Sequence, residues 1–557
     1  MSRHAGPSNR MFGRRSIVKA GAAGAAGSLL LPRISFAQDA TPSGSSAASP
    51  AANADGFYPS TGPGIYDAYS KMPATFKATD GAPGNGEKVS ALVMIYGAPA
   101  TSKDGNAYWQ GLNQRMNIDW SPIQVPNSSY GEKASAIFAG GDLPDLIYLN
   151  FNQTSTPLQK FVKDGAFVDL TDYVTGDNLQ KYPNLAKFPD YMWQACATDG
   201  RIYGVPCPSG RSGQVPAHRL DWVNKLLGHE PTNAQEMHDL MVGMAKNDPD
   251  GNGSDDTWAI ARYSSDWDMS ILYPMHRVPN EWRVNDDGSF TRSIETDEYK
   301  ATLEFITQAV KDGAYHPDSV SMQFEESLNL FNSGRTGIHA DGGAIYGKNG
   351  FLETIRKYAP DAEVTRLIPF GADGGKGVTY NLPGIFGFTA IGSQHEGNDD
   401  KIDLMLRIFN WLSSPFGSEE WLYKTYGEEG THFTYNENGF PVRTELMDKE
   451  EGSLTAYIGG SLQVFWNPDD PTIPPLQQQE QIKVLEIGID NPAQNLYSPT
   501  QISESPVLSQ IINDAVTSIV TGREDISSLD KVREDWKSRG GDKIREELQE
   551  AYKANQG

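Results

Sequence analysis

An acidic stretch at residues 248–256 has the spacing of a cation-binding loop. Its sequence, DPDGNGSDD, places oxygen-bearing side chains at alternate positions and a glycine where such a loop must turn sharply. Hard oxygen donors in this pattern predict one structural Ca²⁺ ion, which would fix the loop without taking part in a reaction. The candidate ligands are the side chains of Asp248, Asp250, Asn252 and Asp256 and the main-chain carbonyl of Ser254.

The stretch departs from a complete EF-hand at its twelfth position. A bidentate glutamate is typical there, but the residue is Ala259. We therefore interpret the stretch as a related calcium loop, with a solvated turn of Asp and Asn residues as the alternative.

Three tryptophans in polar, loop-like surroundings are a second chemical signal. They are Trp267, Trp282 and Trp466, within SSDWDMS, NEWRV and FWNPDD. A flat aromatic face beside carboxylates and amides suits a sugar ring, which has an apolar face and a rim of hydroxyls. Packing within a core is the alternative for each of them.

Catalytic motifs are missing from the sequence. It contains no G-x-S-x-G nucleophile elbow and no H-E-x-x-H helix, and its 9 histidines are scattered. Residues 342–349 approach a phosphate-binding loop, but asparagine stands where a hydroxyl is needed. A glycosidase-type carboxylate pair leaves no local signature. We therefore expect a protein that is not an enzyme.

The first 37 residues have the composition of an export signal. Basic residues precede the mildly apolar segment 20–31, and Ser35-Phe36-Ala37 is a small-x-small cleavage pattern. Residues 13–19, GRRSIVK, resemble the twin-arginine motif. Residues 38–55, rich in Ala, Ser and Pro, predict a disordered tether. We expect the mature protein in the periplasm or at the outer face of the cytoplasmic membrane.

The charge of the mature chain excludes one class of partner. Removing residues 1–37 takes away six Lys and Arg residues and no acids, which changes the formal net charge from -24 to about -30. Binding to nucleic acid requires a basic face. We therefore expect no nucleic-acid partner.

Strand-like and helix-like segments alternate after the tether. The strands are predicted at Val89–Tyr96, Trp120–Val125 and Asp145–Leu149, with helices at Ala107–Met116 and Tyr130–Ala139 between them. This order predicts a doubly wound α/β lobe with ligand-binding loops at the carboxyl ends of its strands. A chain of 557 residues needs more than one core. Further helices are predicted at Asp221–Leu227, Ala234–Lys246, Glu295–Lys311, Asp403–Leu412, Ser418–Tyr426, Pro506–Thr521 and Ile544–Ala554.

Residues 199–208, DGRIYGVPCP, predict a hairpin followed by a stiff, extended exit. Asp-Gly favours a type I′ turn, and Pro206 and Pro208 are expected to stop the strand after it. In this register Cys196 faces Tyr203, which disfavours a disulfide between Cys196 and Cys207.

Six stretches together resemble the extracellular solute-binding protein family 1, the maltose-binding-type receptors of ABC importers. Two of the stretches, Tyr426–Phe433 with Asn438-Gly439 and Asp248–Asp256, also resemble the family's branch of large lipoprotein-type and alginate-oligosaccharide-binding members. An acid that often follows this branch's calcium loop is Thr257 here, which is a departure from the pattern. The stretches are Gly140–Ile147, Asp164–Thr171, Asp199–Pro206, Phe331–Ile338, Tyr426–Phe433 with Asn438-Gly439, and Asp248–Asp256.

The resemblance implies an α/β fold of two doubly wound lobes joined by a multi-strand hinge, as in periplasmic binding proteins. By analogy, residues 56–210 and about 370–445 would form lobe 1. Residues 214–368 and about 446–557 would form lobe 2. Pro206 to Gly213 would be the first crossing between them.

The resemblance also implies a function. The protein would be an exported monomeric receptor that captures a carbohydrate, an oligosaccharide, between its lobes and delivers it to an ABC permease. Alternatives are an exported polysaccharide-degrading enzyme, a surface adhesin and a receptor for a non-sugar solute such as a peptide. The predicted ligand-binding residues are Trp267, Trp466, Trp282, Tyr346, Asp341 and Asn152.

Overall fold

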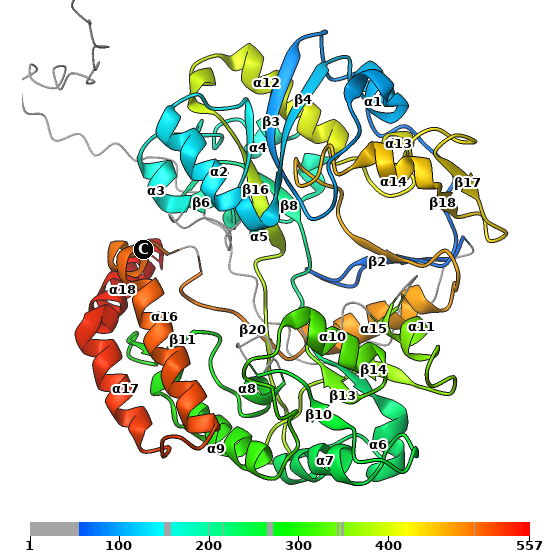
Figure 1. The fold of residues 1–557 in the computed structure, drawn as a ribbon. Coiled ribbons are helices and arrows are strands. Elements are labelled where there is room, and N and C mark those ends of the chain that lie inside the picture. Colours follow the sequence, from blue (N-terminus) through cyan, green and yellow to red (C-terminus); the bar gives the residue numbers. More distant parts are fainter. Residues whose placement is uncertain are drawn as a thin grey trace, which may run out of the picture. The chain divides into compact units, whose positions relative to one another are not determined.

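Two β-sheets, one of five strands and one of four, organise the chain in the computed structural model (Figure 1). We call the sheets and the elements packed on them the first and the second lobe. The described residues all belong to one compact unit, residues 43–557. The predicted signal peptide and the tether up to residue 54 lie outside the described residues. The structure describes residues 55–149, 158–198, 200–213, 215–263, 271–341, 345–346, 350–494 and 496–556.

The five-stranded sheet of the first lobe has the order β4-β3-β5-β16-β8. Strands β3, β4 and β5 are parallel, and β16 lies antiparallel between β5 and β8. Helices α1 and α2 connect the three parallel strands in sequence, which confirms the predicted α/β alternation. The strands are β3 (Lys88–Ile95), β4 (Asp119–Pro126), β5 (Leu146–Leu149), β8 (Val205–Pro208) and β16 (Ile385–Ile391), with the hairpins β6 (Ala197–Thr198)–β7 (Arg201–Ile202) and β17 (Phe433–Tyr435)–β18 (Pro441–Arg443).

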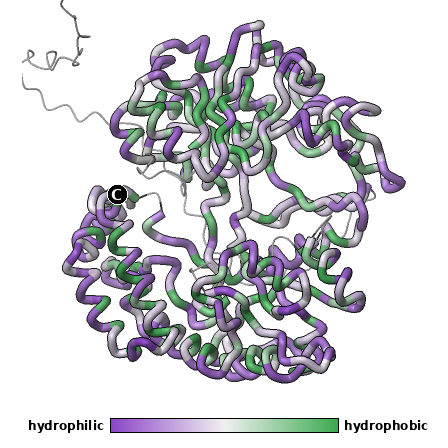
Figure 2. The backbone as a smooth tube through the Cα atoms, viewed as in Figure 1, coloured by the Kyte–Doolittle hydropathy of each residue, from purple (hydrophilic) through white to green (hydrophobic). Residues whose placement is uncertain are grey.

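The helices of the first lobe cover this sheet. Helix α1 begins where the side chain of Asn106 accepts a hydrogen bond from the Trp109 N–H at 2.7 Å. Strand β3 is apolar along its length because it is central in the sheet, and Figure 2 shows hydrophobic positions gathered in this region. The helices are α1 (Ala107–Met116), α2 (Asn127–Gly140), α3 (Leu158–Lys163), α4 (Gly176–Leu179), α5 (Asp190–Gln194), α12 (Asp399–Leu412), α13 (Glu419–Tyr426) and α14 (Glu445–Glu451).

The four-stranded sheet of the second lobe has the order β10-β13-β9-β14. Strands β10 and β13 are parallel, whereas β9 is antiparallel to both β13 and β14. The strands are β9 (Ala217–Arg219), β10 (Trp258–Ile260), β13 (Thr336–His339) and β14 (Val364–Arg366), with the hairpin β11 (Trp282–Val284)–β12 (Phe290–Arg292) beside them. The helices are α6 (Leu220–Leu226), α7 (Ala234–Lys246), α8 (Leu272–Met275), α9 (Asp297–Lys311), α10 (Phe324–Asn332) and α11 (Phe351–Ile355).

Three C-terminal helices, α16 (Pro499–Val520), α17 (Ser528–Trp536) and α18 (Asp542–Gln556), complete the second lobe. Helix α16 begins seven residues before its predicted start and contains Pro506 in its interior. Proline is favoured in the first turn of a helix. The observed helix instead has Pro499 there, after the cap residue Ser498.

The connections between the lobes run through short strands: β1 (Phe57–Tyr58), β2 (Asp67–Tyr69), β15 (Thr379–Tyr380), β19 (Val464–Trp466) and β20 (Gly488–Ile489), with helix α15 (Ile473–Leu485). The first connection, residues 209–216, lies against the second, residues 381–384. The N–H of Ser209 donates to the carbonyl of Gly384 at 2.9 Å, and that of Leu382 donates to the carbonyl of Arg211 at 2.9 Å. The third connection leads from β19 to α15.

The register of the predicted hairpin is observed, but the strand after it extends further than expected. The N–H of Tyr203 donates to the carbonyl of Cys196 at 3.2 Å, as the predicted register requires. However, β8 continues through Pro206 and Cys207 and ends at Pro208. Strand β8 is at the edge of its sheet, where a residue without an N–H is tolerated. Cys196 and Cys207 are both buried and free.

The hydrophobic cores place two stretches differently from the predicted lobe boundaries. Met447, Leu454 and Ile458 pack in the core of the first lobe, beyond the boundary expected near residue 445. Phe370 and Tyr380 pack against the core of the second lobe, although the first lobe was expected to resume near residue 370. The family analogy gave these positions only approximately, because no local pattern marks where a chain changes lobe.

Candidate ligand-binding site

The carboxyl ends of β3 and β5 form the topological switch point of the first sheet. Strand β3 is flanked by β4 on one side and β5 on the other, so the connections after β3 and β5 diverge. Ligands of open α/β sheets bind outside the carboxyl ends of the strands at such a point. Tyr96 follows β3 directly and is 62% exposed.

Four aromatic residues gather at this edge, and we call them the aromatic platform: Tyr96, Tyr148, Phe386 and Tyr457. The ring of Tyr457 stacks on that of Tyr148, with 4.9 Å between centroids, and lies 5.3 Å from that of Phe386. Tyr96 meets Tyr457 edge-on at 6.4 Å. Phe386 is 37% exposed, so the platform presents aromatic surface to solvent.

Local hydrogen bonds fix the platform. The hydroxyl of Tyr148 donates to the carbonyl of Phe386 at 2.9 Å, and that of Thr389 donates to the carbonyl of Tyr457 at 2.7 Å. Tyr457 has a φ of 64°, which is unusual for a residue other than glycine. Such backbone strain of about 1–3 kcal/mol persists only where the surroundings impose it, and it concentrates at functional sites.

Burial, followed by the proximity of Tyr96, raises the pKa of Tyr457 to about 12. Partial burial also raises the pKa of Tyr96. Both hydroxyls therefore stay protonated in neutral solution. Beside an apolar ring face, each offers a donor and an acceptor to a polar ligand.

The carboxyl ends of β10 and β13 form the corresponding edge of the second sheet. Asp341 lies two residues beyond β13, and Arg262 two residues beyond β10. His339, the last residue of β13, is 6% exposed and is enclosed by Phe324, Phe331 and Phe351, with centroid distances of 5.3 to 5.7 Å. Among the described residues its Nε2 atom has no hydrogen-bond partner. Burial first, and then Arg262, lower the pKa of His339 to about 4.

Tyr346 lies in a buried polar cluster of the second lobe. Its hydroxyl donates to Oε1 of Glu480 at 2.9 Å, and Arg366 Nη1 lies 3.5 Å from Oε2 of the same carboxylate. Burial and Glu480 raise the pKa of Tyr346. Glu480 comes from α15, so this helix fixes the orientation of the phenol.

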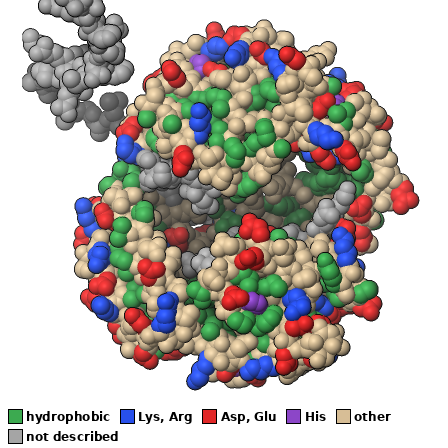
Figure 3. All heavy atoms as spheres, viewed as in Figure 1, with side chains coloured by type: hydrophobic (Ala, Val, Ile, Leu, Met, Phe, Trp, Pro, Cys, Tyr) green, Lys and Arg blue, Asp and Glu red, His purple; other side chains and the backbone are tan. Residues whose placement is uncertain are grey.

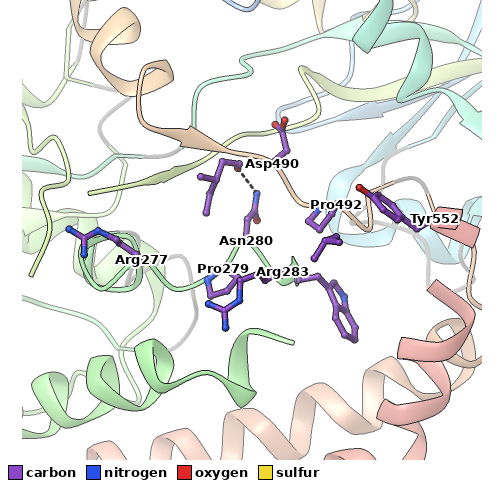
Figure 4. Close-up of a pocket in the computed structure, with 10 residues that line it drawn as sticks. Arg277, Pro279, Asn280, Arg283, Asp490, Pro492 and Tyr552 are labelled. Atoms are coloured by element: carbon purple, nitrogen blue, oxygen red, sulfur yellow. Dashed lines mark hydrogen bonds between the residues drawn. The ribbon is translucent and has the colours of Figure 1, made fainter. Parts of the chain in front are cut away.

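A cavity of about 340 Å³ lies between the β11 region, residues 489–492 and helix α18 (Figure 4). Its two arginines are engaged: Arg277 forms a two-point pair with Asp373 at 2.7 and 3.0 Å, and Arg283 pairs with Glu298 at 3.0 Å. In Figure 4 their side chains extend away from Tyr552. Because both guanidinium groups are already paired with carboxylates, we consider the cavity less suited than the aromatic platform to bind a polar ligand.

The predicted ligand residues have different positions. Asn152 and Trp267 lie outside the described residues. Trp282 is 3% exposed and packs against Phe290 and Trp536, which gives it a core position instead of an open stacking face. Trp466 is surrounded by aromatic rings and stacks on Phe440 at 5.8 Å. Their polar neighbours in sequence suggested loops. Hydrophobic partners cover the indole of Trp282, whereas Trp466 is only partly buried.

Sequence reasoning missed the aromatic platform. Its four members come from four different stretches of the chain, and Tyr457 has no local pattern that marks it. Tyr96 carried a usable signal, because it ends an apolar strand-length run where the α/β rule places ligand loops.

The predicted calcium loop folds as a tight turn. The carboxylate of Asp248 accepts hydrogen bonds from the N–H groups of Asn252 and Gly253 at 3.0 and 3.1 Å. The amide nitrogen of Asn252 lies 2.8 Å from Asp250 Oδ2 and 3.2 Å from Asp256 Oδ1. Burial, and then a hydrogen bond shared with Asp248, raise the pKa of Asp250.

The donor types of this loop suit Ca²⁺. The amide orientation of Asn252 is fixed because its Oδ1 atom accepts a hydrogen bond from the Ser254 N–H at 2.7 Å, so in this arrangement its nitrogen faces Asp250 and Asp256. Asp256 also pairs with Arg335 at 3.1 Å. Within the described ranges, no three Asp, Glu, His or Cys side chains are grouped as a metal site. The donor types therefore fit a Ca²⁺ ion, whereas the observed side-chain positions do not enclose one.

Side chains of both charges lie on the face of the molecule that Figure 3 shows. In Figure 3, acidic and basic side chains are interspersed over the visible face, and the surface is hollowed between the two lobes. None of the described helices has the length and apolarity needed to cross a membrane.

Comparison with known proteins gives consistent results. Residues 98–394, just over half of the chain, match the model of the family described as bacterial extracellular solute-binding protein. The chain is 26% identical over 462 residues to the polygalacturonan/rhamnogalacturonan-binding protein YtcQ of Bacillus subtilis strain 168, covering 79% of this chain and 86% of that protein.

Two solved structures share the fold. One is the S. pneumoniae ABC-transporter substrate-binding protein FusA in complex with kestose, with a TM-score of 0.60, 16% identity and coverage of 84% of this chain and 99% of that chain. The other is a FusA EF-hand mutant with fructo-nystose, with a TM-score of 0.60, 15% identity and the same coverage. The predicted two-lobed fold of the periplasmic-binding-protein type is confirmed, and the chain belongs to the family of bacterial extracellular solute-binding proteins.

Proposed function

We propose that this protein is an exported receptor that captures an oligosaccharide and delivers it to an ABC permease. The observation that carries the proposal is the aromatic platform at the switch point of the first sheet. Its exposed rings can stack on the apolar face of a sugar ring, and its protonated hydroxyls can form hydrogen bonds with the hydroxyls around that ring. The sugar-binding descriptions of YtcQ and FusA support the same class of ligand.

Asp341 and Tyr346 are the proposed polar contacts from the second lobe. Asp341 follows the carboxyl end of β13, and Tyr346 is held by Glu480. Asn152 and Trp267 remain predictions for the loops after β5 and near β10.

Calorimetric titration of the mature protein with neutral and uronic oligosaccharides tests the proposal. We expect stoichiometric binding of at least one sugar without turnover. Tyr457→Ala should weaken binding about tenfold, because an aromatic contact of this kind contributes about 0.5–1.5 kcal/mol beyond its buried area. Tyr358→Ala is the matched control, since Tyr358 is 68% exposed and is not part of the platform.

The same titration separates the alternatives. Shortened products would favour a polysaccharide-degrading enzyme, and binding of a peptide alone would favour a receptor for a non-sugar solute. Equal affinity of the Tyr457→Ala variant and the wild type would remove the platform from the site.

We also propose that the loop at 248–256 binds Ca²⁺ as a structural ion. The ligands would be Asp248, Asp250, Asn252, Ser254 and Asp256, and the EF-hand described in FusA supports this assignment. Calcium should raise the melting temperature of the wild type but not that of Asp250→Ala. An unchanged melting temperature in the wild type would contradict the assignment.

Export through the twin-arginine route is the remaining part of the proposal. It rests on the basic motif at residues 13–19 and agrees with the extracellular description of the family. Replacing Arg14 and Arg15 together by Lys should leave the precursor inside the cell. Continued export of this variant would favour the general secretory route.

A further inference from the structure

The first folded residues of the chain lie at the third connection between the lobes. Strand β2 pairs in parallel with β19, with Asp67 opposite Val464 and Tyr69 opposite Trp466, and β1 pairs with β2. Strand β19 is the last strand before the chain passes to α15. Residues 57–69, which we call the strap, therefore add two strands to this connection.

The strap is bound to α15, the helix that follows the third connection, through two buried glutamines. Gln478 of α15 is 0% exposed, and its Nε2 atom donates to the carbonyls of Tyr58, Pro59 and Tyr66 at 3.1, 3.3 and 2.7 Å. The N–H of Tyr66 also donates to Oε1 of Gln481 at 2.8 Å. Figure 1 shows β2 beside α15.

The strap is bound to the first lobe through aromatic packing. The ring of Tyr69 lies 4.8 Å from that of Phe416, which in turn packs against Trp421 at 4.6 Å. These rings belong to the hydrophobic cluster next to α13. A rearrangement that separates this cluster from α15 must break one set of strap contacts.

Tyr66 extends the strap to the other connections. Its hydroxyl donates to Oε1 of Gln463 at 2.8 Å, just before β19. A Cβ atom on Gly210, in the first connection, would lie only 3.1 Å from the same hydroxyl. Burial raises the pKa of Tyr66, so the hydroxyl remains a donor.

We propose that the strap is a conformational restraint that limits the separation of the two lobes. It joins the α13 cluster to α15 and lies against the first connection, so it acts at the pivot of any opening.

Pulsed electron spin resonance on the ligand-free protein tests this proposal. Spin labels at Lys133→Cys on α2 and Asp239→Cys on α7 report the distance between the lobes. In Gln478→Leu, we expect a longer mean distance and a broader distribution, because three carbonyls lose their donor. Gln479→Leu is the control, since Gln479 is the exposed neighbour. Unchanged distances in a folded Gln478→Leu protein would overturn the proposal.

Hydrogen exchange of the wild type provides a test that does not depend on a variant. Amides of residues 57–69 should exchange as slowly as those of β19, because the strap and β19 open together. Exchange of the strap more than about tenfold faster than β19 would mean that it opens independently, which would also overturn the proposal.

Discussion

His339 should make the stability of the second lobe depend on pH. His339 is the last residue of β13, and the rings of three phenylalanines surround it. Burial, and then the nearby Arg262, lower its pKa from the ordinary 6.5 to about 4. The unfolded chain therefore binds a proton as the pH falls through 6.5, whereas the folded chain remains neutral until the pH is near 4. Stability is present above pH 6.5 and is lost progressively below it.

The size of this loss follows from the two pKa values. One pKa unit corresponds to about 1.4 kcal/mol, so the full difference is about 3 kcal/mol, of which about 2 kcal/mol is lost by pH 5. The side chain is only 6% exposed, so solvent screening reduces this value little. This loss is large relative to typical domain stabilities of about 5–15 kcal/mol.

Urea unfolding of the wild type and His339→Phe at about pH 7.5 and pH 5 measures the effect. The variant keeps a flat ring among the phenylalanines but cannot titrate. We expect the free energy of unfolding of the wild type to fall by about 2 kcal/mol more than that of the variant over this interval. All other titrating groups are common to both proteins. Parallel losses in the two proteins would refute the reasoning.

Three further outcomes concern residues of the first lobe. Gly204→Ala should destabilise the protein by about 1–3 kcal/mol in urea unfolding, because its Cβ would lie 2.2 Å from the ring of Phe388. Gly140→Ala, within α2 and without a neighbour inside 4 Å, should instead stabilise it by about 0.5–1 kcal/mol. Glu420→Ala should cost about 2–5 kcal/mol, since two N–H groups of residues 78–79, bonded to it at 3.0 Å, lose their acceptor. Thermal melting at neutral pH measures the loss of stability in Glu420→Ala, and a loss below about 0.5 kcal/mol would contradict this prediction.

The regular elements of the first lobe could be predicted from sequence because their patterns are local. The apolar run of β3 and the helical segment of α1 each carry a period and an end signal, and the predicted range of α1 matches the observed one. The long α7 is likewise observed at Ala234–Lys246, after its cap residue Asn233. The alternating order of strands and helices then predicted that a ligand would bind at the carboxyl ends of the strands.

The candidate site could not be predicted in the same way, because its contacts join distant parts of the chain. Tyr96, Phe386 and Tyr457 meet only when β16 returns to the first sheet. Trp282 lacks an open stacking face for the same reason: its covering partner Trp536 comes from another element. Trp466 packs on Phe440 but is only partly buried, and its role in ligand binding stays a prediction. Local composition describes the neighbours along the chain, not those in space.

The return of β16 to the first lobe also has a consequence for biosynthesis. This strand, Ile385–Ile391, supplies the pairing partner of both β5 and β8, although it follows the entire second sheet in the sequence. A nascent chain that ends before it exposes two unpaired strand edges, which are prone to association with other chains. The amino-terminal half therefore cannot complete its sheet during early synthesis, and an N-terminal fragment lacking β16 should aggregate. Long-range pairing of this kind also makes folding slow.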